Sequence, residues 1–190
     1  MYKRQLLNNN SETNRLDSEI LLAECLKIRN RLDLFINLNQ RLTKDQISIF
    51  FNLIKERQKC KPISKIIKKK EFWDFEVDVS KKVLIPRPET EVLLDLVSKV
   101  IKKNLNIRFL DVGCGSGCIS LALLNIFFNS SGQAFDISRD AVINTKLNLK
   151  KYNKLDRVKV FQKDLFQFKT DKKYDLIISN PPYLKLSDYI

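Results

Sequence analysis

Apolar positions in the first third of the chain recur with the spacing of amphipathic helices. One run begins near Asp17, which can cap it, and a second begins at Thr43, which has the spacing of a capping box with Gln46. The apolar positions are Ile20, Leu21, Leu22, Cys25, Leu26 and Ile28, and then Ile47, Phe50, Phe51 and Ile54. Because proline restricts the residue before it, we expect the second helix to end at Lys61-Pro62.

Residues 63–88 show a different pattern. Lys65–Lys70 is rich in lysine and should lie in solvent. Phe75, Val77 and Val79 alternate with acidic residues, which predicts a half-buried strand. The two prolines on either side of Arg87 then hold the chain extended and rigid.

From Glu91 onward the pattern alternates between helix and strand. The predicted helices are 91–103, 118–128 and 139–152, and the predicted strands are 107–112, 133–136, 158–162 and 174–179. Such alternation indicates βαβ units and a parallel sheet covered on both faces. The sequence therefore predicts an α/β fold with a Rossmann-like sheet. We expect a helical domain at 1–70, a strand or hairpin connector at 71–90 and the α/β domain at 91–190.

Composition narrows the chemistry. The chain has 190 residues, of which 44% are hydrophobic, and no apolar run is long enough for a membrane span or a signal peptide, so we expect a cytoplasmic protein without membrane contact. It has no histidine and no CxxC pair, which argues against a metal site and excludes Ser-His and Cys-His nucleophiles. We expect all four cysteines to be small buried thiols: Cys25, Cys60, Cys114 and Cys118.

The charge balance is strongly basic, with 35 basic and 22 acidic residues and a net charge of +13. One interpretation is a surface that binds nucleic acid or the ribosome. The other is compositional, because lysine, asparagine, isoleucine and phenylalanine are abundant and the lysines are scattered along the chain. The sequence alone leaves both open.

A glycine-rich turn follows the first predicted strand of the α/β region. Gly113, Cys114, Gly115, Ser116 and Gly117 contain three of the four glycines in the chain. Glycines let a backbone approach a ligand closely and adopt positive φ, so the turn is a candidate nucleotide-type site. A plain tight turn between strand and helix is the alternative.

Acidic residues follow the next two strands. Asp136 ends the second strand about 20 residues after the glycine turn, where a carboxylate can accept both ribose hydroxyls of a nucleoside. Asp164 follows the third strand and can accept from the exocyclic amine of an adenine, with Leu165 packing on the ring. Helix capping near Asp136, by Ser138 also, and an ordinary loop acid at Asp164 are the alternatives.

The fourth strand ends in Asn180, Pro181, Pro182 and Tyr183. Two prolines make this loop rigid. The asparagine side-chain oxygen and a backbone carbonyl can together accept two N–H bonds from a planar NH2 group, and Tyr183 can pack on its flat face. This loop stands at the carboxyl end of a parallel strand, where ligands bind.

With these motifs, the second half resembles the class I methyltransferases whose Asn-Pro-Pro-Tyr loop directs methylation of planar amino groups. Residues 83–91 read VLIPRPETE, which is similar to the hallmark of the release-factor glutamine N5-methyltransferases. Phe72-Trp73, Pro62-Ile63 and the helical N-terminal region fit the same family, and the resemblance runs from about Leu16 to Leu184.

The resemblance implies a function. The cofactor would be S-adenosyl-L-methionine, and the substrate would be the side-chain amide of the glutamine in the Gly-Gly-Gln loop of a peptide-chain release factor, docked by the N-terminal domain. It implies catalytic roles for Asn180, Pro181 and Tyr183, with Pro182 also contacting the substrate. The implied cofactor-binding residues are Gly113, Cys114, Gly115, Ser116, Gly117, Asp136, Asp164, Leu165 and Asn180.

The chain departs from the family pattern in two places. Lys65 and Lys68 stand where the family usually carries an aromatic residue and a glycine. Family members also continue past the Asn-Pro-Pro-Tyr loop, whereas this chain ends at Ile190. From this we expect an incomplete sheet, with an open edge at the fourth strand and impaired catalysis.

Two other functions remain open. An adenine N6-methyltransferase acting on nucleic acid shares the Asn-Pro-Pro-Tyr loop and would suit the positive charge, although residues 83–91 argue against it. Direct nucleic-acid binding is therefore not favoured. The second alternative is an inactive, truncated remnant that only binds a partner.

Overall fold

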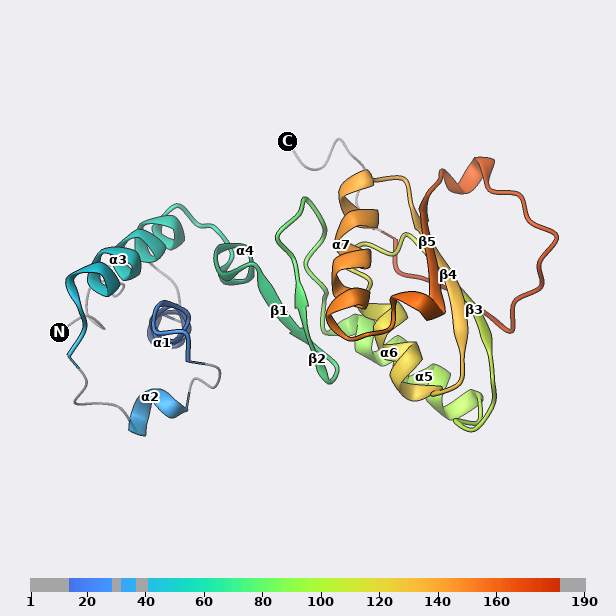
Figure 1. Ribbon diagram of the computed structural model, residues 1–190, viewed down its shortest axis with the longest axis horizontal. Helices are drawn as coiled ribbons and strands as arrows, with labels where there is room; N and C mark the ends of the chain where they lie inside the picture. Colours follow the sequence, from blue (N-terminus) through green and yellow to red (C-terminus); the bar gives the residue numbers. More distant parts are fainter. Residues whose placement is uncertain (1–13, 29–31, 37–40, 182–190) are drawn as a thin grey trace. The chain divides into compact units, whose positions relative to one another are not determined.

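The computed structural model describes residues 14–28, 32–36 and 41–181. The chain divides into two compact units, residues 1–68 and 69–190 (Figure 1). The first unit is helical, with α1 at Asn14–Cys25, α2 at Asp33–Ile36, α3 at Lys44–Gln58 and α4 at Ile63–Ile67. Its core joins α1 and α3 through Leu21, Cys25, Phe50 and Ile54, which are all buried.

The helix starts of this unit agree only in part with the sequence pattern. The capping box is confirmed, because Thr43 and Gln46 each accept a backbone N–H from the other at the start of α3. The predicted cap at Asp17 is wrong. Asp17 lies within the first turn of α1, and its Oδ2 accepts from Nε of Arg57 on α3 at 2.7 Å. The Asp17 carboxylate therefore pairs with an arginine of another helix instead of capping α1.

The end of α3 also differs from the prediction. The helix ends at Gln58, before Lys61-Pro62, and the chain turns at Cys60 with φ at 61°. Cys25, Cys114 and Cys118 are buried, but Cys60 is exposed in this turn. The expectation that all four thiols are buried is therefore wrong for Cys60.

The lysine-rich segment is folded rather than free in solvent. Ile66 and Ile67 of α4 pack against the core of the first unit, and Lys69–Phe72 forms β1. Strand β1 pairs antiparallel with β2, Phe75–Asp78. The predicted alternation in β2 is confirmed, because Phe75 and Val77 are buried while Glu76 is exposed.

Lys68 adopts the left-handed conformation, with φ at 61°. The family that the sequence resembles usually has glycine at this position. Glycine has no Cβ and therefore adopts the left-handed conformation without strain. We expect Lys68→Gly to raise the free energy of unfolding by up to about 1 kcal/mol, because the relieved strain exceeds the added entropy of the unfolded chain. Urea unfolding measures the change. Lys69→Gly, within β1, is the control and should be destabilising; equal destabilisation by both changes would contradict the prediction.

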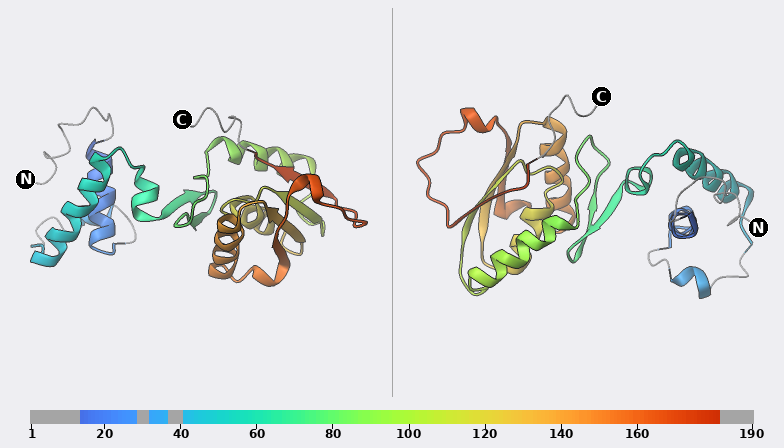
Figure 2. Two further views of the ribbon diagram at one scale, coloured as in Figure 1. Left: turned by 90° about the horizontal axis from the view of Figure 1, so that it is seen from above. Right: turned by 180° about the vertical axis from the view of Figure 1, so that it is seen from behind.

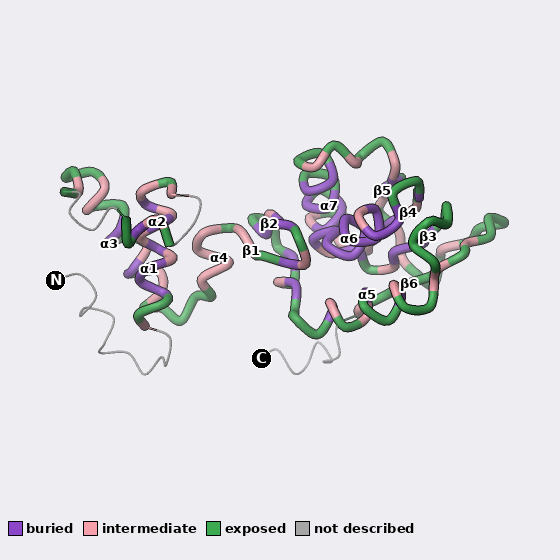
Figure 3. Tube along the Cα trace, turned by 90° about the horizontal axis from the view of Figure 1, so that it is seen from below, coloured by how far each residue is buried: buried purple, intermediate pink, exposed green. Residues whose placement is uncertain are grey.

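The second unit contains the predicted parallel sheet. Its strands are β3 at Arg108–Val112, β4 at Ser131–Asp136, β5 at Val158–Gln162 and β6 at Leu176–Ser179, in the order β5-β4-β3-β6. Every neighbouring pair is parallel, which confirms the Rossmann-like α/β fold. Helices α5 (Glu89–Val100), α6 (Cys118–Ile126) and α7 (Arg139–Lys151) lie on one side of the strands (Figures 1 and 3). Two short 3-10 turns, η2 at Leu155–Arg157 and η3 at Leu165–Gln167, flank β5.

Strand register explains where the core lies. Asp111, Ala134, Val160 and Ile178 are aligned across the four strands and all are buried, so they share the helix-covered face. Ile177, next to Ile178, points to the other face and is 64% exposed. In the described part of the chain, β6 is therefore covered on one face. The sequence pattern had predicted a sheet covered on both faces. Helix α6 is buried along nearly all its length, as Figure 3 shows.

Within the second unit, the β1–β2 hairpin is bound by side chains of α7 and of the residue that follows it. Asn144, Asn148 and Tyr152 follow one another at four-residue intervals, so they lie on one helix face. All three bond to the backbone of β2 at Glu76 or Asp78. Strand β2 consequently packs on α6 and α7 without joining the main sheet (Figure 2).

Candidate functional site

The sheet order brings the predicted motifs to one edge. The loops that follow β6, β3, β4 and β5 leave from the carboxyl ends of adjacent parallel strands. Asn180, the Gly113–Gly117 turn and Asp164 lie in the loops after β6, β3 and β5, and Asp136 is the last residue of β4. In sheets of this kind, ligands bind outside the carboxyl ends of the strands.

A cavity of about 430 Å³ opens at this edge. That volume lies in the range of small-molecule and cofactor sites. The predicted site residues that line it are Gly113, Cys114, Gly115, Ser116, Asp136, Asp164, Leu165, Asn180 and Pro181. Gly117 is not among the lining residues, and Pro182 and Tyr183 lie outside the described residues.

The first and last glycines of the turn have different roles. Gly113, Gly115 and Gly117 have φ of 72°, 55° and 79°, where other residues are strained. A Cβ at Gly113 would meet no atom within 4 Å, so this part of the turn faces open space at the cavity. A Cβ at Gly117 would lie 2.9 Å from Cγ2 of Thr145 on α7. Gly117 therefore allows α6 and α7 to approach closely, while Gly113 leaves the cavity wall open.

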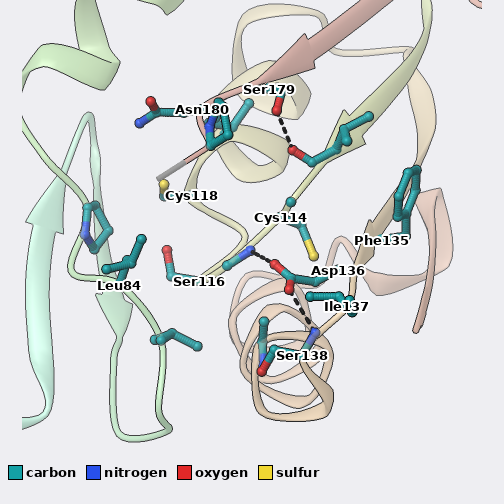
Figure 4. Close-up of a pocket in the computed structure, with 18 of the residues that line it drawn as sticks. Leu84, Cys114, Ser116, Cys118, Phe135, Asp136, Ile137, Ser138, Ser179 and Asn180 are labelled. Atoms are coloured by element: carbon teal, nitrogen blue, oxygen red, sulfur yellow. Dashed lines mark hydrogen bonds between the residues drawn. The ribbon is translucent and has the colours of Figure 1, made fainter. Parts of the chain in front are cut away.

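The Asp136 carboxylate is fixed by two backbone donors. Its Oδ2 accepts from the N–H of Gly115 at 3.0 Å, and its Oδ1 accepts from the N–H of Ser138 at 2.9 Å (Figure 4). Helix capping itself falls to Ser138, whose Oγ accepts from the N–H of Ala141. Asp136 thus joins the glycine turn to the start of α7 and still lines the cavity, where its remaining lone pairs can accept from a ligand.

The wall beyond Asp136 is apolar. Ile137 and Leu165 line the cavity although they are 67% and 54% exposed. Phe135 also lines it, and its ring stacks on Phe168 at a centroid distance of 4.6 Å. Asp164 caps η3 by accepting the N–H of Phe166 at 2.9 Å. A flat apolar group can fit between such side chains, with a carboxylate at its edge.

Asn180 is held by a residue that the sequence reasoning did not assign. Its Nδ2 donates to Oγ1 of Thr90 at 2.6 Å, and Thr90 lines the cavity in the first turn of α5. The preceding residue, Ser179, donates its Oγ proton to the carbonyl of Val112 at 2.8 Å, which ties the loop to β3 (Figure 4). The Asn-Pro loop and the segment before α5 therefore meet at one wall of the cavity.

The segment before α5 forms most of that wall. Leu84, Ile85, Pro86 and Arg87 line the cavity. In the sequence, this segment is recognisable only as a family hallmark. At its end, Glu91 accepts the backbone N–H of Trp73 at 2.9 Å, which fixes the hairpin turn beside α5.

Asp111 is a second residue in this region that no sequence motif marks. It is fully buried in β3, two residues before Gly113. Its Oδ2 accepts from Oγ of Ser120 at 2.6 Å, and its Oδ1 has no hydrogen-bond partner among the described residues. Burial away from water raises the pKa of this carboxyl to about 6, although the Ser120 bond opposes the shift.

This raised pKa predicts a pH effect on stability. The contribution of protonated Asp111 to the free energy of unfolding is fully present below about pH 4. It is lost as the pH rises through about 6. We expect the stability of Asp111→Asn relative to wild type to increase over this window by on the order of 2 kcal/mol, because asparagine does not ionise. Urea unfolding of both proteins at several pH values measures it, with Asp95→Asn on α5 as the exposed control. A constant difference between pH 4 and 7 would contradict the prediction.

The cavity cysteines are poor nucleophiles. Burial raises the pKa of Cys118 to about 12, and it raises the pKa of Cys114 further. Thr145 Oγ1 lies 3.2 Å from the Cys114 sulfur and can donate to it. Both thiols stay protonated near neutral pH, so the site cannot use thiolate chemistry.

Family comparisons agree with the arrangement of the two units. The sequence model of the methyltransferase small domain matches residues 89–188, and that of the PrmC N-terminal domain matches residues 1–67. None of the helices in the described ranges combines the length and apolar character needed to cross a membrane.

Three relatives show the range of similarity. A release factor glutamine methyltransferase from Buchnera aphidicola is 38% identical, over 93% of this chain and 63% of the relative. One from Rhodopirellula baltica is 35% identical, over 94% and 62%. A bifunctional methyltransferase from Rickettsia typhi is 35% identical, over 97% and 40%. The chain therefore spans less than two thirds of the length of these relatives.

A solved S-adenosylmethionine-dependent methyltransferase from Geobacter sulfurreducens aligns with a TM-score of 0.42 and 22% identity, over 49% of this chain and 36% of that one. The two family matches confirm the resemblance read from residues 62–91 and from the Asn-Pro-Pro-Tyr motif. The model of the PrmC N-terminal domain matches the residues before it, and the chain belongs to the methyltransferase small domain family.

Proposed function

We propose that this protein transfers a methyl group from S-adenosyl-L-methionine to the side-chain amide nitrogen of a glutamine in the Gly-Gly-Gln loop of a peptide-chain release factor. The observation that carries this proposal is the cavity that Asn180, the glycine turn and Asp136 line together. The names of the relatives from Buchnera aphidicola and Rhodopirellula baltica support the choice of substrate.

The residues present fit such a cofactor. A nucleoside with an amino-acid tail needs a glycine turn for close approach, an acceptor for ribose hydroxyls and a flat apolar slot for its base. Gly113 leaves open space at the cavity wall, Asp136 has lone pairs to offer, and Ile137 and Leu165 line the slot beside Asp164. When bound, the cofactor would supply an electrophilic methyl group on a positively charged sulfur.

The substrate side of the site works by positioning. An amide nitrogen is a poor nucleophile because its lone pair is delocalised into the carbonyl, so the reaction gains most from holding the nitrogen in line. Asn180 Oδ1 and the carbonyl of Pro181 would accept the two N–H bonds of the NH2 group. Pro182 and Tyr183 would set the plane of the amide. No step requires histidine, and the chain has none.

A second candidate is methylation of adenine N6 in nucleic acid. The net charge of +13 favours it, since a basic surface attracts phosphates, and the same two acceptors could hold an exocyclic amine. The names of the relatives from Buchnera aphidicola and Rhodopirellula baltica favour the release factor instead. We propose that this first unit docks the release factor.

The test uses the 190-residue chain with labelled cofactor. Methyl transfer is measured to an unmodified release factor, to the same factor with alanine in place of the Gly-Gly-Gln glutamine, and to DNA and RNA. We expect label only in the unmodified factor. Label in nucleic acid alone would support the adenine reaction, and no label in any acceptor would contradict both.

A further inference from the structure

We infer that Thr145 is a positioning residue, which holds the peptide group between Gly115 and Ser116 so that its N–H binds the amino-acid tail of the cofactor. The inference deepens the proposed function and rests on its cofactor, not on its substrate. Thr145 lies on α7, 30 positions after Gly115, and does not itself line the cavity. The contact that carries the inference is the hydrogen bond from Oγ1 of Thr145 to the carbonyl of Gly115, at 3.1 Å.

The direction of this hydrogen bond follows from the chemistry of its two atoms. A carbonyl oxygen only accepts, so the hydroxyl of Thr145 is the donor. The sulfur of Cys114 lies 3.2 Å from the same Oγ1, but sulfur is a weak acceptor and competes poorly with a carbonyl. Thr145 is completely buried, so water does not compete for its hydroxyl proton.

The side chain of Thr145 is also held by its methyl group. A Cβ built on Gly117 would lie 2.9 Å from Cγ2 of Thr145, so this methyl group lies directly against the turn. A β-branched side chain is stiff about χ1, and here its two branches contact two different glycines of the turn. The hydroxyl of Thr145 therefore has a defined position next to Gly115.

The Gly115 carbonyl determines where the next N–H points. The peptide group is planar and trans, so the N–H of Ser116 points opposite to the carbonyl of Gly115. Among the described residues this N–H has no hydrogen-bond partner, although Ser116 is only 3% exposed and lines the cavity. The other N–H groups of the turn donate within the protein, to the carbonyl of Phe135 from Gly113 and Cys114, to Asp136 from Gly115 and to the carbonyl of Cys114 from Gly117.

The two neighbouring peptide groups are held by other residues. The N–H of Gly115 donates to Oδ2 of Asp136 at 3.0 Å, and the carbonyl of Ser116 accepts from Nδ2 of Asn148 at 2.8 Å. Between these two contacts, the peptide group from Gly115 to Ser116 is bound by Thr145. Loss of the Thr145 hydroxyl therefore changes the orientation of the Ser116 N–H and leaves the rest of the turn in place.

The free N–H selects one part of the cofactor. An N–H binds an anionic acceptor more strongly than a neutral one. The carboxylate of the amino-acid tail is the one anionic group of S-adenosyl-L-methionine, whereas its ribose and its base offer neutral groups. Thr145 should therefore influence binding of the tail and leave binding of the nucleoside unchanged.

The binding test compares two ligands that differ in this tail. S-adenosyl-L-homocysteine has the tail, and 5′-methylthioadenosine has the nucleoside without it. Calorimetry with the 190-residue chain measures both affinities in wild type, Thr145→Val and Thr145→Ser. We expect Thr145→Val to bind S-adenosyl-L-homocysteine about fivefold to thirtyfold more weakly, and 5′-methylthioadenosine within about twofold of wild type. Thr145→Ser keeps the hydroxyl and should restore most of the lost affinity.

Thr170→Val is the matched control. Oγ1 of exposed Thr170 also takes part in a hydrogen bond, accepting from the N–H of Lys172 at 3.1 Å, but Thr170 does not line the cavity. Its affinity for both ligands should stay within about twofold of wild type. Unchanged affinity of Thr145→Val for S-adenosyl-L-homocysteine, or equal losses for the two ligands, would overturn the inference.

A second measurement uses wild type alone and holds even where Thr145→Val does not fold. The amide resonance of Ser116 is assigned in protein labelled with 13C and 15N. We expect its proton to move downfield when S-adenosyl-L-homocysteine binds, because a hydrogen bond forms, and to stay near its free position with 5′-methylthioadenosine. The same displacement with both ligands, or none with either, would also overturn the inference.

Failure of the inference is distinct from failure of the proposed function. If wild type binds S-adenosyl-L-homocysteine but methylates no release factor, the proposed substrate is wrong, and the binding data still decide the role of Thr145. If wild type binds neither ligand, the proposed cofactor and the inference both fail. If wild type and Thr145→Val bind S-adenosyl-L-homocysteine equally, the inference alone fails.

Discussion

Asn148→Ala is expected to lower the free energy of unfolding of the second unit by about 2–3 kcal/mol, because the N–H of Asp78 and the carbonyl of Ser116 lose a buried partner, while the carbonyl of Asp78 keeps its bond from Asn144. Asn148 is completely buried on α7. Its Oδ1 accepts from the N–H of Asp78 at 2.7 Å, and its Nδ2 donates to the carbonyls of Asp78 at 2.9 Å and Ser116 at 2.8 Å. Alanine would leave these three backbone groups without this partner.

Asn125→Ala is the matched control for that change. Asn125 also donates to the hairpin, but the bond to Asp74 is 3.3 Å long and exposed. We expect an effect below about 0.5 kcal/mol there, as for other exposed sites. Urea unfolding followed by tryptophan fluorescence suits the measurement, because the only tryptophan, Trp73, lies in the hairpin turn. Similar losses for the two asparagines would show that the buried bonds have no special weight.

Asp136→Asn is expected to weaken binding of S-adenosyl-L-methionine by about tenfold to a hundredfold, equivalent to roughly 1–3 kcal/mol. Asparagine has one acceptor oxygen, whereas Asp136 has two, and both already accept backbone N–H groups of Gly115 and Ser138. The change must therefore break one of these bonds and also remove an acceptor for a ribose hydroxyl. Titration calorimetry with the cofactor measures the affinity.

Asp140→Asn provides the comparison. Asp140 lies in the first turn of the same helix, so its loss changes the local charge equally, but it does not line the cavity. We expect its cofactor affinity to stay within about twofold of wild type, since a partly exposed charge that does not contact the ligand contributes little. Unchanged affinity in Asp136→Asn would remove Asp136 from the cofactor site.

The sheet could be predicted because its signals are local. Strands such as Val158–Gln162 combine β-branched residues with flanking turns, and the helices between them have clear periodicity. Parallel pairing then follows from the alternation of strand and helix. The errors arose where a distant residue decided the outcome. Asp17 binds Arg57 from another helix instead of capping its own, and local sequence gives no sign of this.

The candidate site was predictable to the same extent. Glycines at 113–117 and acids after two strands give local signals, and the sheet order places them together. Thr90 and Asp111 give none, because one acts through a contact 90 positions away and the other is a strand residue whose burial defines it. Gly117 looks like its neighbours in sequence, and only the closeness of Thr145 separates its packing role from theirs.

Because of the way α7 binds the hairpin, residues of the hairpin can be substituted more freely than the residues of α7 that bind it. Asn144, Asn148 and Tyr152 bind backbone groups of β2, not its side chains. Exposed hairpin positions such as Glu71 can therefore change identity without loss of these backbone contacts, whereas the α7 positions cannot. The information that specifies where the hairpin binds thus resides in the helix, and a hairpin of different sequence, grafted with the same backbone and buried residues, should be accepted in its place.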